Sequence, residues 1–258
     1  MRLVVIPGFF CKKRFLIRSA VLFVLCIALA FLYPNVFDSQ TTISLALVGK
    51  TVVVDAGHGG IDPGVVGVYG SSEKEINLAI AKDLENLLQQ AGANVVMTRD
   101  TDAALENGKR NDLNGRIRLV EDNKAAIFIS MHCNSFKQIP STRGAQVFYS
   151  ATNEEGRLLA LAIQDRLNEF MINSKKRVAL KHQNSFLLKN IKIPSVIVEV
   201  GFLSNAEEEA LLNEPNYQWE MAWAIYEGLL DYLTLEEQPD ITEGNPVNET
   251  DTNETDMN

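Results

Sequence analysis

Residues 51–60 read TVVVDAGHGG, a short run of β-branched residues that leads directly into a glycine-rich loop. The valines favour a buried strand, and the glycines favour a turn at its carboxyl end. The loop carries His58 between Gly57 and Gly59. We therefore predict a strand over residues 51–55 whose end presents an imidazole.

The same alternation of apolar runs and amphipathic stretches continues along the chain to residue 233. Further strands are predicted over residues 93–98, 126–131, 145–149 and 195–200, and helices over 77–90, 113–122, 154–171, 206–212 and 217–233. Strands that alternate with helices form a largely parallel sheet covered on both faces. The predicted fold class is therefore α/β, with functional side chains at the carboxyl ends of strands.

Charge divides the 258 residues into three regions. Residues 1–40 carry a net charge of +4, residues 41–235 carry −5 and residues 236–258 carry −8, for −9 overall. We predict a basic stub and a membrane-directed segment in the first, a folded domain in the second and a disordered acidic tail in the third. The acidic total argues against nucleic acid as the main partner.

The N-terminal region contains an uncharged stretch, residues 19–37, that follows a basic cluster. As a helix it would extend about 28 Å, close to the thickness of a bilayer's hydrocarbon core. The basic cluster places the N-terminus in the cytoplasm and the rest of the chain outside. A cleaved signal peptide would use Ala28-Leu29-Ala30, whereas the bulky residues 31–33 favour an uncleaved transmembrane anchor. Under both interpretations the folded domain is exported from the cytoplasm.

The chain has three histidines, and two of them directly follow predicted strands. His58 follows the strand over 51–55, and His132 follows the strand over 126–131. Imidazole is the commonest zinc ligand, so two histidines at matching strand ends indicate a candidate metal site. The third, His182, lies in a basic stretch and is interpreted as a surface or substrate-side residue.

Two carboxylates could complete such a site. A catalytic zinc usually takes a third protein ligand, and Glu73 is a candidate, although a carboxylate before a helix also suits the helix dipole. Glu75 fits the pattern as well. Glu199 interrupts the apolar strand SVIVEVGF, where a carboxylate is unfavourable without a reason. It is either the general base and acid of a metallohydrolase or half of a structural ion pair.

Two residues close to the histidines, Cys133 and Asp55, are interpreted as packing or supporting residues and not as metal ligands. Cys133 would point to the opposite face of its strand from His132, so we predict a small buried residue and not a ligand. Asp55 either orients His58 or caps the loop. Cysteines occur only at positions 11, 26 and 133, without a CxxC pair, so no disulfide framework is predicted.

Six segments in register carry a family resemblance over about residues 49–233. They are VVVDAGHGGIDPGVVG, SSEKEINLAIA, VVMTRDTD, FISMHCNS, GAQVFY and VEVGFLSN. Together they resemble the zinc-dependent N-acetylmuramoyl-L-alanine amidases of bacterial cell walls. The resemblance implies a three-layer α/β/α domain with a mixed, mostly parallel sheet of about six strands.

The same resemblance implies a site with one Zn²⁺ ion. Its ligands would be His58, Glu73 and His132, and its catalytic residue would be Glu199. The family's EK dipeptide matches Glu73 and the lysine after it, which favours this glutamate over Glu75. The departure is at position 133, where the family usually has alanine and this chain has cysteine.

The implied reaction is hydrolysis of the amide between N-acetylmuramic acid and L-alanine in peptidoglycan. One N-terminal membrane segment and a bare catalytic domain look like the germination-specific amidases of endospore-forming bacteria, which prepare the muramic lactam of the spore cortex. The alternatives are a vegetative cell-wall amidase, a zinc peptidase that cuts elsewhere in the stem peptide, and a non-catalytic wall-binding protein. Between His132 and Glu199 we predict one strand, the helix over 154–171 and the basic stretch, without an extra helix that could fold back over the zinc. We therefore expect an open site that needs no activating partner.

Overall fold

The computed structural model describes residues 46–171 and 176–236, together with Phe23. The predicted membrane segment within residues 1–40 and the predicted acidic tail from residue 237 onward lie outside the described residues. Within the described part of the chain, no helix is both long and apolar enough to cross a membrane.

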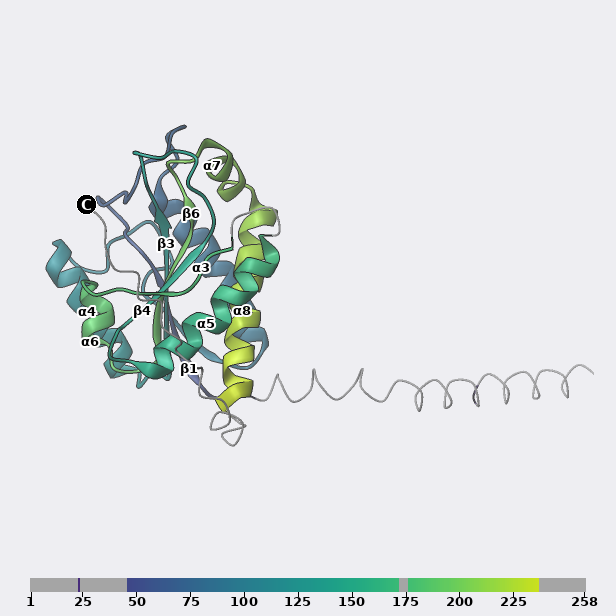
Figure 1. Ribbon diagram of the computed structural model, residues 1–258. Helices are drawn as coiled ribbons and strands as arrows, with labels where there is room; N and C mark the ends of the chain where they lie inside the picture. The colour runs from purple at the N-terminus through teal and green to yellow at the C-terminus, as the bar shows by residue number, and fades with distance from the viewer. Residues whose placement is uncertain (1–22, 24–45, 172–175, 237–258) are drawn as a thin grey trace, which may run out of the picture. The chain divides into compact units, whose positions relative to one another are not determined.

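The core of the domain is a mixed six-stranded sheet with the order β2-β1-β3-β6-β4-β5 (Figure 1). Its strands are β1 (Thr51–Ala56), β2 (Asn94–Met97), β3 (Ile127–Asn134), β4 (Gln146–Tyr149), β5 (Leu180–Lys181) and β6 (Ser195–Phe202). Strands β2, β1, β3 and β6 run parallel, whereas β4 is antiparallel to β6 and parallel to β5. The predicted mixed, mostly parallel sheet is confirmed.

Helices cover both faces of this sheet. They are α3 (Glu73–Gln90), α4 (Lys109–Asp122), α5 (Glu154–Phe170), α6 (Phe186–Asn190), α7 (Ala206–Leu212) and α8 (Pro215–Glu236). Helices α3, α5 and α8 pack together on one face, and α4 packs with α6 on the other (Figure 1). The three-layer α/β/α architecture is therefore confirmed.

The two apolar layers differ greatly in size. The layer under α3, α5 and α8 contains most of the buried side chains, from Leu47 to Leu233. The layer under α4 and α6 is a small cluster built around Val53, Phe128 and Leu187. Since apolar burial is the main stabilising term in folding, the first layer carries most of the stability. The second layer leaves room for a cleft on its side of the sheet.

The structure also corrects several predicted boundaries near the site. Strand β3 continues to Asn134, so His132 lies within the strand and not after it. Helix α3 begins at Glu73, four residues earlier than predicted. The sequence analysis did not predict β5 or α6, because segments of two and five residues are too short to show a period.

Candidate metal centre and its cleft

The first element of the site is the loop that follows β1. His58 has a φ of 63°, in the left-handed region, which costs a non-glycine residue about 1–3 kcal/mol. The conformation is supported from α4, since Arg116 Nη2 donates a hydrogen bond to the carbonyl oxygen of His58 (3.1 Å). Gly57, just before it, donates its N–H to the carbonyl oxygen of Met131 (3.0 Å). These contacts join the loop to α4 and β3.

The second element is the start of α3. The Glu73 side chain is only 2% exposed. Its Oε2 accepts a hydrogen bond from the backbone N–H of Val65 (2.7 Å), and its Oε1 accepts one from the backbone N–H of Cys133 (3.0 Å). Both carboxylate oxygens are therefore held by the backbone, which fixes the orientation of the group.

The third element is β3, which brings His132 to the same carboxylate. Glu73 Oε1 lies 3.2 Å from His58 Nε2 and 3.0 Å from His132 Nδ1. Ligand atoms about 2.0–2.1 Å from a tetrahedral ion are about 3.3 Å apart, so these separations fit a shared metal ion. The candidate ligand atoms of the three residues all lie within 4.8 Å of one another. The structure thus brings the three predicted ligands together as a group that could hold a metal, and the exposed Glu75 is not in it.

A glycine is needed where the loop meets the His132 ring. A Cβ atom built on Gly57 would lie 2.3 Å from His132 Cε1 and 2.4 Å from its Nε2. No side chain fits there without displacing the imidazole. Gly57, the first glycine of the AGHGG segment, therefore leaves the space that the His132 ring occupies, in addition to its place in the turn.

The charges of the cluster are strongly coupled. Burial opposes the ionisation of Glu73, but hydrogen bonds with His132 and His58 hold its pKa well below the usual range. For His58, burial alone would lower the pKa, yet contacts with Glu73 and Asp62 raise it. The carboxylate is therefore ionised at neutral pH and provides the negative charge that a divalent cation requires.

Asp62 supports His58, and the sequence analysis did not identify it. Its Oδ2 lies 2.9 Å from His58 Nδ1, and its Oδ1 accepts the backbone N–H of Gly64 (3.1 Å). A carboxylate on the second ring nitrogen orients a metal-binding imidazole and raises its basicity. The available signal was an aspartate four residues after a histidine in a glycine-rich loop.

We expect Asp62→Ala to weaken zinc affinity by about 10–100-fold, because outer partners of metal-binding histidines contribute by that factor. Zinc titration against a competing chelator measures the change. Asp100→Ala, which removes an exposed carboxylate, is the matched control. Equal zinc affinity in wild type and Asp62→Ala would rule out this supporting role.

Asp55 acts on the loop indirectly. Its side chain is fully buried and accepts hydrogen bonds from Thr98 Oγ1 (2.7 Å) and Ser130 Oγ (2.5 Å), and it pairs with Arg116. The described residues show no hydrogen bond between Asp55 and the His58 ring, so of the two roles left open for Asp55 a direct orientation of the ring is not seen. Asp55 acts on the loop through Arg116, which holds the His58 carbonyl. Neither the arginine nor this route was identified from sequence.

We expect Asp55→Asn to lower the free energy of unfolding by about 1.5–3 kcal/mol at pH 7, the usual contribution of hydrogen bonds to a charged group. Burial opposes ionisation, but Arg116 and Ser130 hold the pKa of Asp55 below its usual range. Its stabilisation is thus present above the unfolded-state pKa and is lost as pH falls through the lower folded-state value. Denaturant unfolding should show the deficit of the variant shrinking below about pH 4; a deficit independent of pH would contradict the assignment.

Arg99 is a second buried cation that sequence patterns did not reveal. Its guanidinium donates hydrogen bonds to the carbonyl oxygens of Ala56 (2.9 Å), Gly57 (3.0 Å) and Lys74 (2.7 Å). It therefore ties the end of β1 to the first turn of α3, which are the two elements that carry His58 and Glu73.

Glu199 lies beside this group on the neighbouring strand. Strand β6 pairs with β3 so that Glu199 is directly opposite His132. Its Oε2 is buried and has no hydrogen-bond partner among the described residues. Burial, together with the negative charge of Glu73, raises the pKa of Glu199 to about 7, against the opposing effect of His132. The described residues show no cation paired with this glutamate, as the ion-pair interpretation would require.

Cys133 matches its prediction. Its side chain is buried in the large apolar layer, with Sγ 3.6 Å from Asn77 Oδ1. Burial raises the pKa of this thiol well above its ordinary value, so it stays protonated. Its direct hydrogen bond to the candidate ligands comes from its backbone N–H, which donates to Glu73 Oε1.

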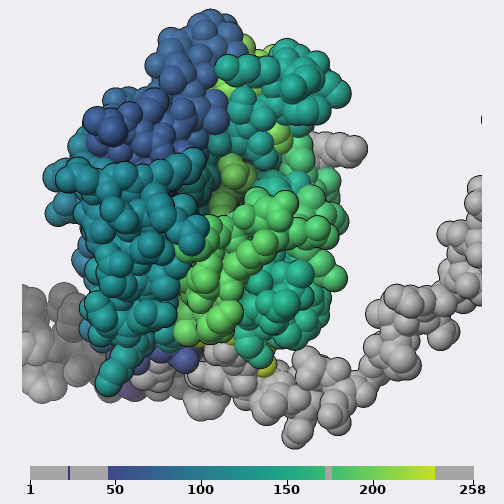
Figure 2. Space-filling view, turned by 90° about the vertical axis from the view of Figure 1, so that its left-hand side faces the viewer, coloured from purple at the N-terminus to yellow at the C-terminus, as the bar shows by residue number. Residues whose placement is uncertain are grey.

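A cleft of about 950 Å³ opens from the histidines across the face of the sheet. His58, Asp62 and His132 line one part of it, and His182 and Phe186 line another. The space-filling view shows this hollow between segments of the first and second halves of the chain (Figure 2). His182 therefore lines the same cleft as the candidate ligands His58 and His132 but lies outside the metal-binding group.

Comparisons with known proteins agree with this geometry. Residues 52–231 match the protein family described as N-acetylmuramoyl-L-alanine amidase. The chain is 39% identical over 226 residues to the germination-specific N-acetylmuramoyl-L-alanine amidase of Bacillus subtilis, an alignment that covers 83% of this chain and 93% of that protein.

Solved structures of the same kind are similar in fold. The CwlD amidase from Clostridioides difficile, in complex with the GerS lipoprotein, has a TM-score of 0.69 and 37% identity, covering 72% of this chain and 100% of that one. The amidase AmiC2 of Nostoc punctiforme has a TM-score of 0.66 and 34% identity, covering 72% and 97%. The predicted resemblance is confirmed, and the chain belongs to the N-acetylmuramoyl-L-alanine amidase family.

Proposed function

We propose that this protein hydrolyses the amide between N-acetylmuramic acid and L-alanine in peptidoglycan, with one zinc ion held by His58, Glu73 and His132. The observation that carries the proposal is the position of Glu199. A buried carboxylate oxygen that finds no partner among the described residues, opposite His132 on the next strand, is unfavourable for folding and is explained by catalysis.

The side chains divide the chemistry between them. A bound zinc ion supplies Lewis acidity for the scissile carbonyl and makes water a stronger acid. Glu199, whose pKa burial raises to about 7 in the metal-free protein, would take the proton of the attacking water and pass it to the leaving amine, the role of a general base and acid. Asp62 and Arg116 hold His58 in place while this occurs.

The physiological role we propose is in the spore cortex, in preparation for germination. The support is the identity to a germination-specific amidase over most of both chains and the similarity to the CwlD amidase. The predicted N-terminal anchor would place the domain on the outer face of the cytoplasmic membrane, where peptidoglycan is accessible. The comparison structure is a complex with a lipoprotein, and the expectation that this chain acts without an activator stays a prediction.

We expect purified protein with zinc to release stem peptides that begin with L-alanine from peptidoglycan, and a chelator to abolish this release. Mass spectrometry of the products identifies the bond, and restoring zinc should restore the cleavage. Cuts at a different bond would reassign the protein as a zinc peptidase. A folded, zinc-loaded protein that cleaves nothing would mean either that an activating partner is required or that the protein is not catalytic.

A further inference from the structure

The part of the cleft lined by His182 and Phe186 has no role in the chemistry described so far. It is formed by the residues around α6 and by the start of α4, from which Lys109 lines the cleft. The two walls meet where the Arg110 guanidinium lies 4.0 Å from the centre of the Phe186 ring. This end of the cleft is therefore built from two elements that contact each other.

The His182 ring is fixed in one orientation. Its Nδ1 accepts hydrogen bonds from the backbone N–H groups of Asn184 (3.2 Å) and Ser185 (2.9 Å). Its edge packs against Phe148, with ring centres 5.5 Å apart and an angle of 73° between the rings. Because Nδ1 is an acceptor in both bonds, a neutral ring carries its proton on Nε2.

Nε2–H is the donor that this ring leaves available. The described residues provide no hydrogen-bond partner for Nε2, and the residue lines the cleft. A donor already oriented by two backbone bonds loses little side-chain entropy when a ligand binds it. The ring therefore has the properties of a binding residue and not of a structural one alone.

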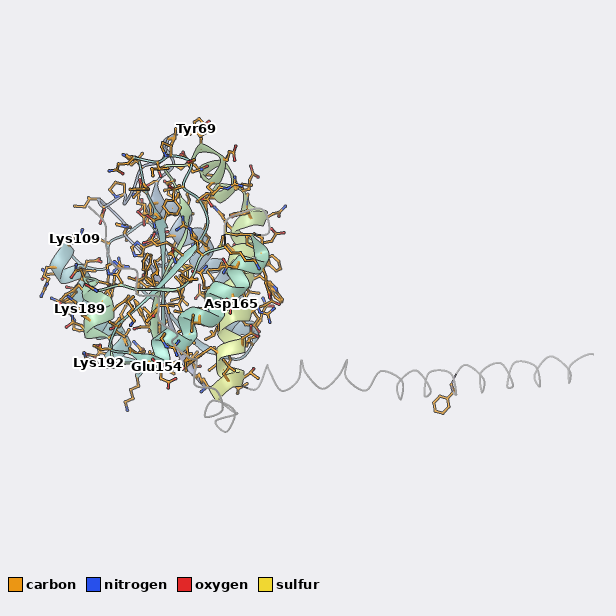
Figure 3. The ribbon with its side chains drawn as sticks, in the orientation of Figure 1. Tyr69, Lys109, Glu154, Asp165, Lys189 and Lys192 are labelled. Atoms are coloured by element: carbon orange, nitrogen blue, oxygen red, sulfur yellow. The ribbon has the colours of Figure 1, made fainter. Side chains whose placement is uncertain are left out.

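The charged side chains that line the cleft are of both signs. Among the described residues, the basic ones in the lining are Lys109 and Arg116. Lys109 and Lys189 lie on this side of the molecule, with α4 and α6 (Figure 3). Four acidic residues also line the cleft, and each has a partner: Asp55 and Asp112 pair with Arg116, Glu106 pairs with Arg118, and Asp62 contacts His58.

The ammonium of Lys109 differs from these arginines, since within the described part of the chain it forms no close ion pair, although its charge helps to lower the pKa of Asp62. An N–H donor and an exposed ammonium that line the same cleft suit a carboxylate, which accepts charge-assisted hydrogen bonds. We propose that His182 and Lys109 form a subsite for a free carboxylate of the stem peptide. This subsite rests on the proposed function, because it assumes a peptidoglycan substrate.

The test uses two muramoyl peptides that differ only in whether the stem carboxylates are free or amidated. The key variant is His182→Asn, since the Asn side-chain oxygen can still accept the backbone N–H groups while the donor at the Nε2 position is lost. With the full zinc-loaded chain, we expect His182→Asn to raise KM for the free-acid peptide by about 10–100-fold, the effect of losing a hydrogen bond to a charged group. The kcat, and the KM of the amidated peptide, should change by less than about twofold.

Three further variants test whether the effect is specific to the subsite. His182→Gln retains a side-chain N–H at similar reach and should bring KM back toward the wild-type value. Gln183→Ala alters an exposed neighbour outside the cleft lining and should leave both peptides unaffected. Lys109→Met should raise KM for the free acid only, and less at high salt, because screening already weakens an exposed charge.

A KM that rises equally for both peptides, or that does not rise in His182→Asn, would overturn the subsite. The two proposals can fail separately. The mass of the product identifies the bond that is cleaved and so tests the amidase function. The ratio of KM between the free-acid and amidated peptides measures the contribution of the carboxylate and so tests the subsite. If the wild-type protein cleaves neither peptide, the amidase assignment fails, and calorimetric binding of the same two peptides to the same variants then decides the subsite.

Discussion

Replacing Glu199 with glutamine is expected to lower kcat on peptidoglycan by about 10²–10⁴-fold, the usual contribution of a general acid–base. Glutamine keeps the shape of the side chain but can neither accept the proton of water nor return it to the amine. The three candidate ligands are untouched, so the affinity for zinc should change little. Product release measured with saturating zinc gives the fold-change, and chelator competition gives the zinc affinity.

The same substitution is expected to stabilise the metal-free protein at neutral and higher pH. Burial raises the pKa of Glu199 to about 7 from an ordinary value of 4.5. Between these values the folded state holds a proton that the unfolded state has lost. The wild type therefore loses stability as pH rises through this interval, by on the order of 3 kcal/mol, and remains at the lower level above it.

Glu199→Gln has no such titration. The gain in its free energy of unfolding over that of the wild type should therefore be near zero at pH 4 and largest near pH 8. Denaturant unfolding of chelator-treated protein at both pH values measures the difference. Glu214→Gln, at an exposed position, is the control and should change neither activity nor stability. A Glu199→Gln protein that is less stable than wild type at pH 8 would mean that the carboxylate has a stabilising partner.

Replacing Glu73 with glutamine is expected to remove zinc binding and weaken the fold together. Both of its oxygens accept backbone N–H groups, from Val65 and Cys133. An amide can accept only one of them and turns its NH₂ toward the other donor, which costs about 1–3 kcal/mol for a buried group. The loss of the negative charge should lower zinc affinity by at least about 100-fold, since even outer partners contribute 10–100-fold.

Unfolding of the metal-free variant and zinc titration separate the two effects. Glu75→Gln is the matched control, two residues further along the same helix but exposed and outside the metal-binding group. If Glu73→Gln kept wild-type zinc affinity, the three-residue ligand set would be wrong, whatever its effect on stability. If only zinc affinity fell, the hydrogen bonds to the backbone would not contribute as described.

The strand-and-helix alternation was readable from sequence because it depends on local periodicity. Runs such as TVVVD and SVIVEV are apolar enough to indicate buried strands, and all five strands predicted from the pattern are present. The elements that were missed, β5 and α6, are too short to have a period. The continuation of β3 through His132 was missed because its pairing with β6, which includes a register shift after His132, is a tertiary contact.

The sequence by itself determined the α/β class, the family and the residues proposed for the metal site, because each of these can be recognised from contiguous segments of the chain. Only the tertiary structure decided which contacts support them. The Asp55–Arg116 pair joins residues 61 positions apart, and Cys133 meets Glu73 across 60 positions. Whether Glu199 has a partner, and whether His182 faces the same cleft as His58, also depend on strand order and helix packing. Sequence spacing does not encode such distances, since the chain returns to the same site from elements far apart.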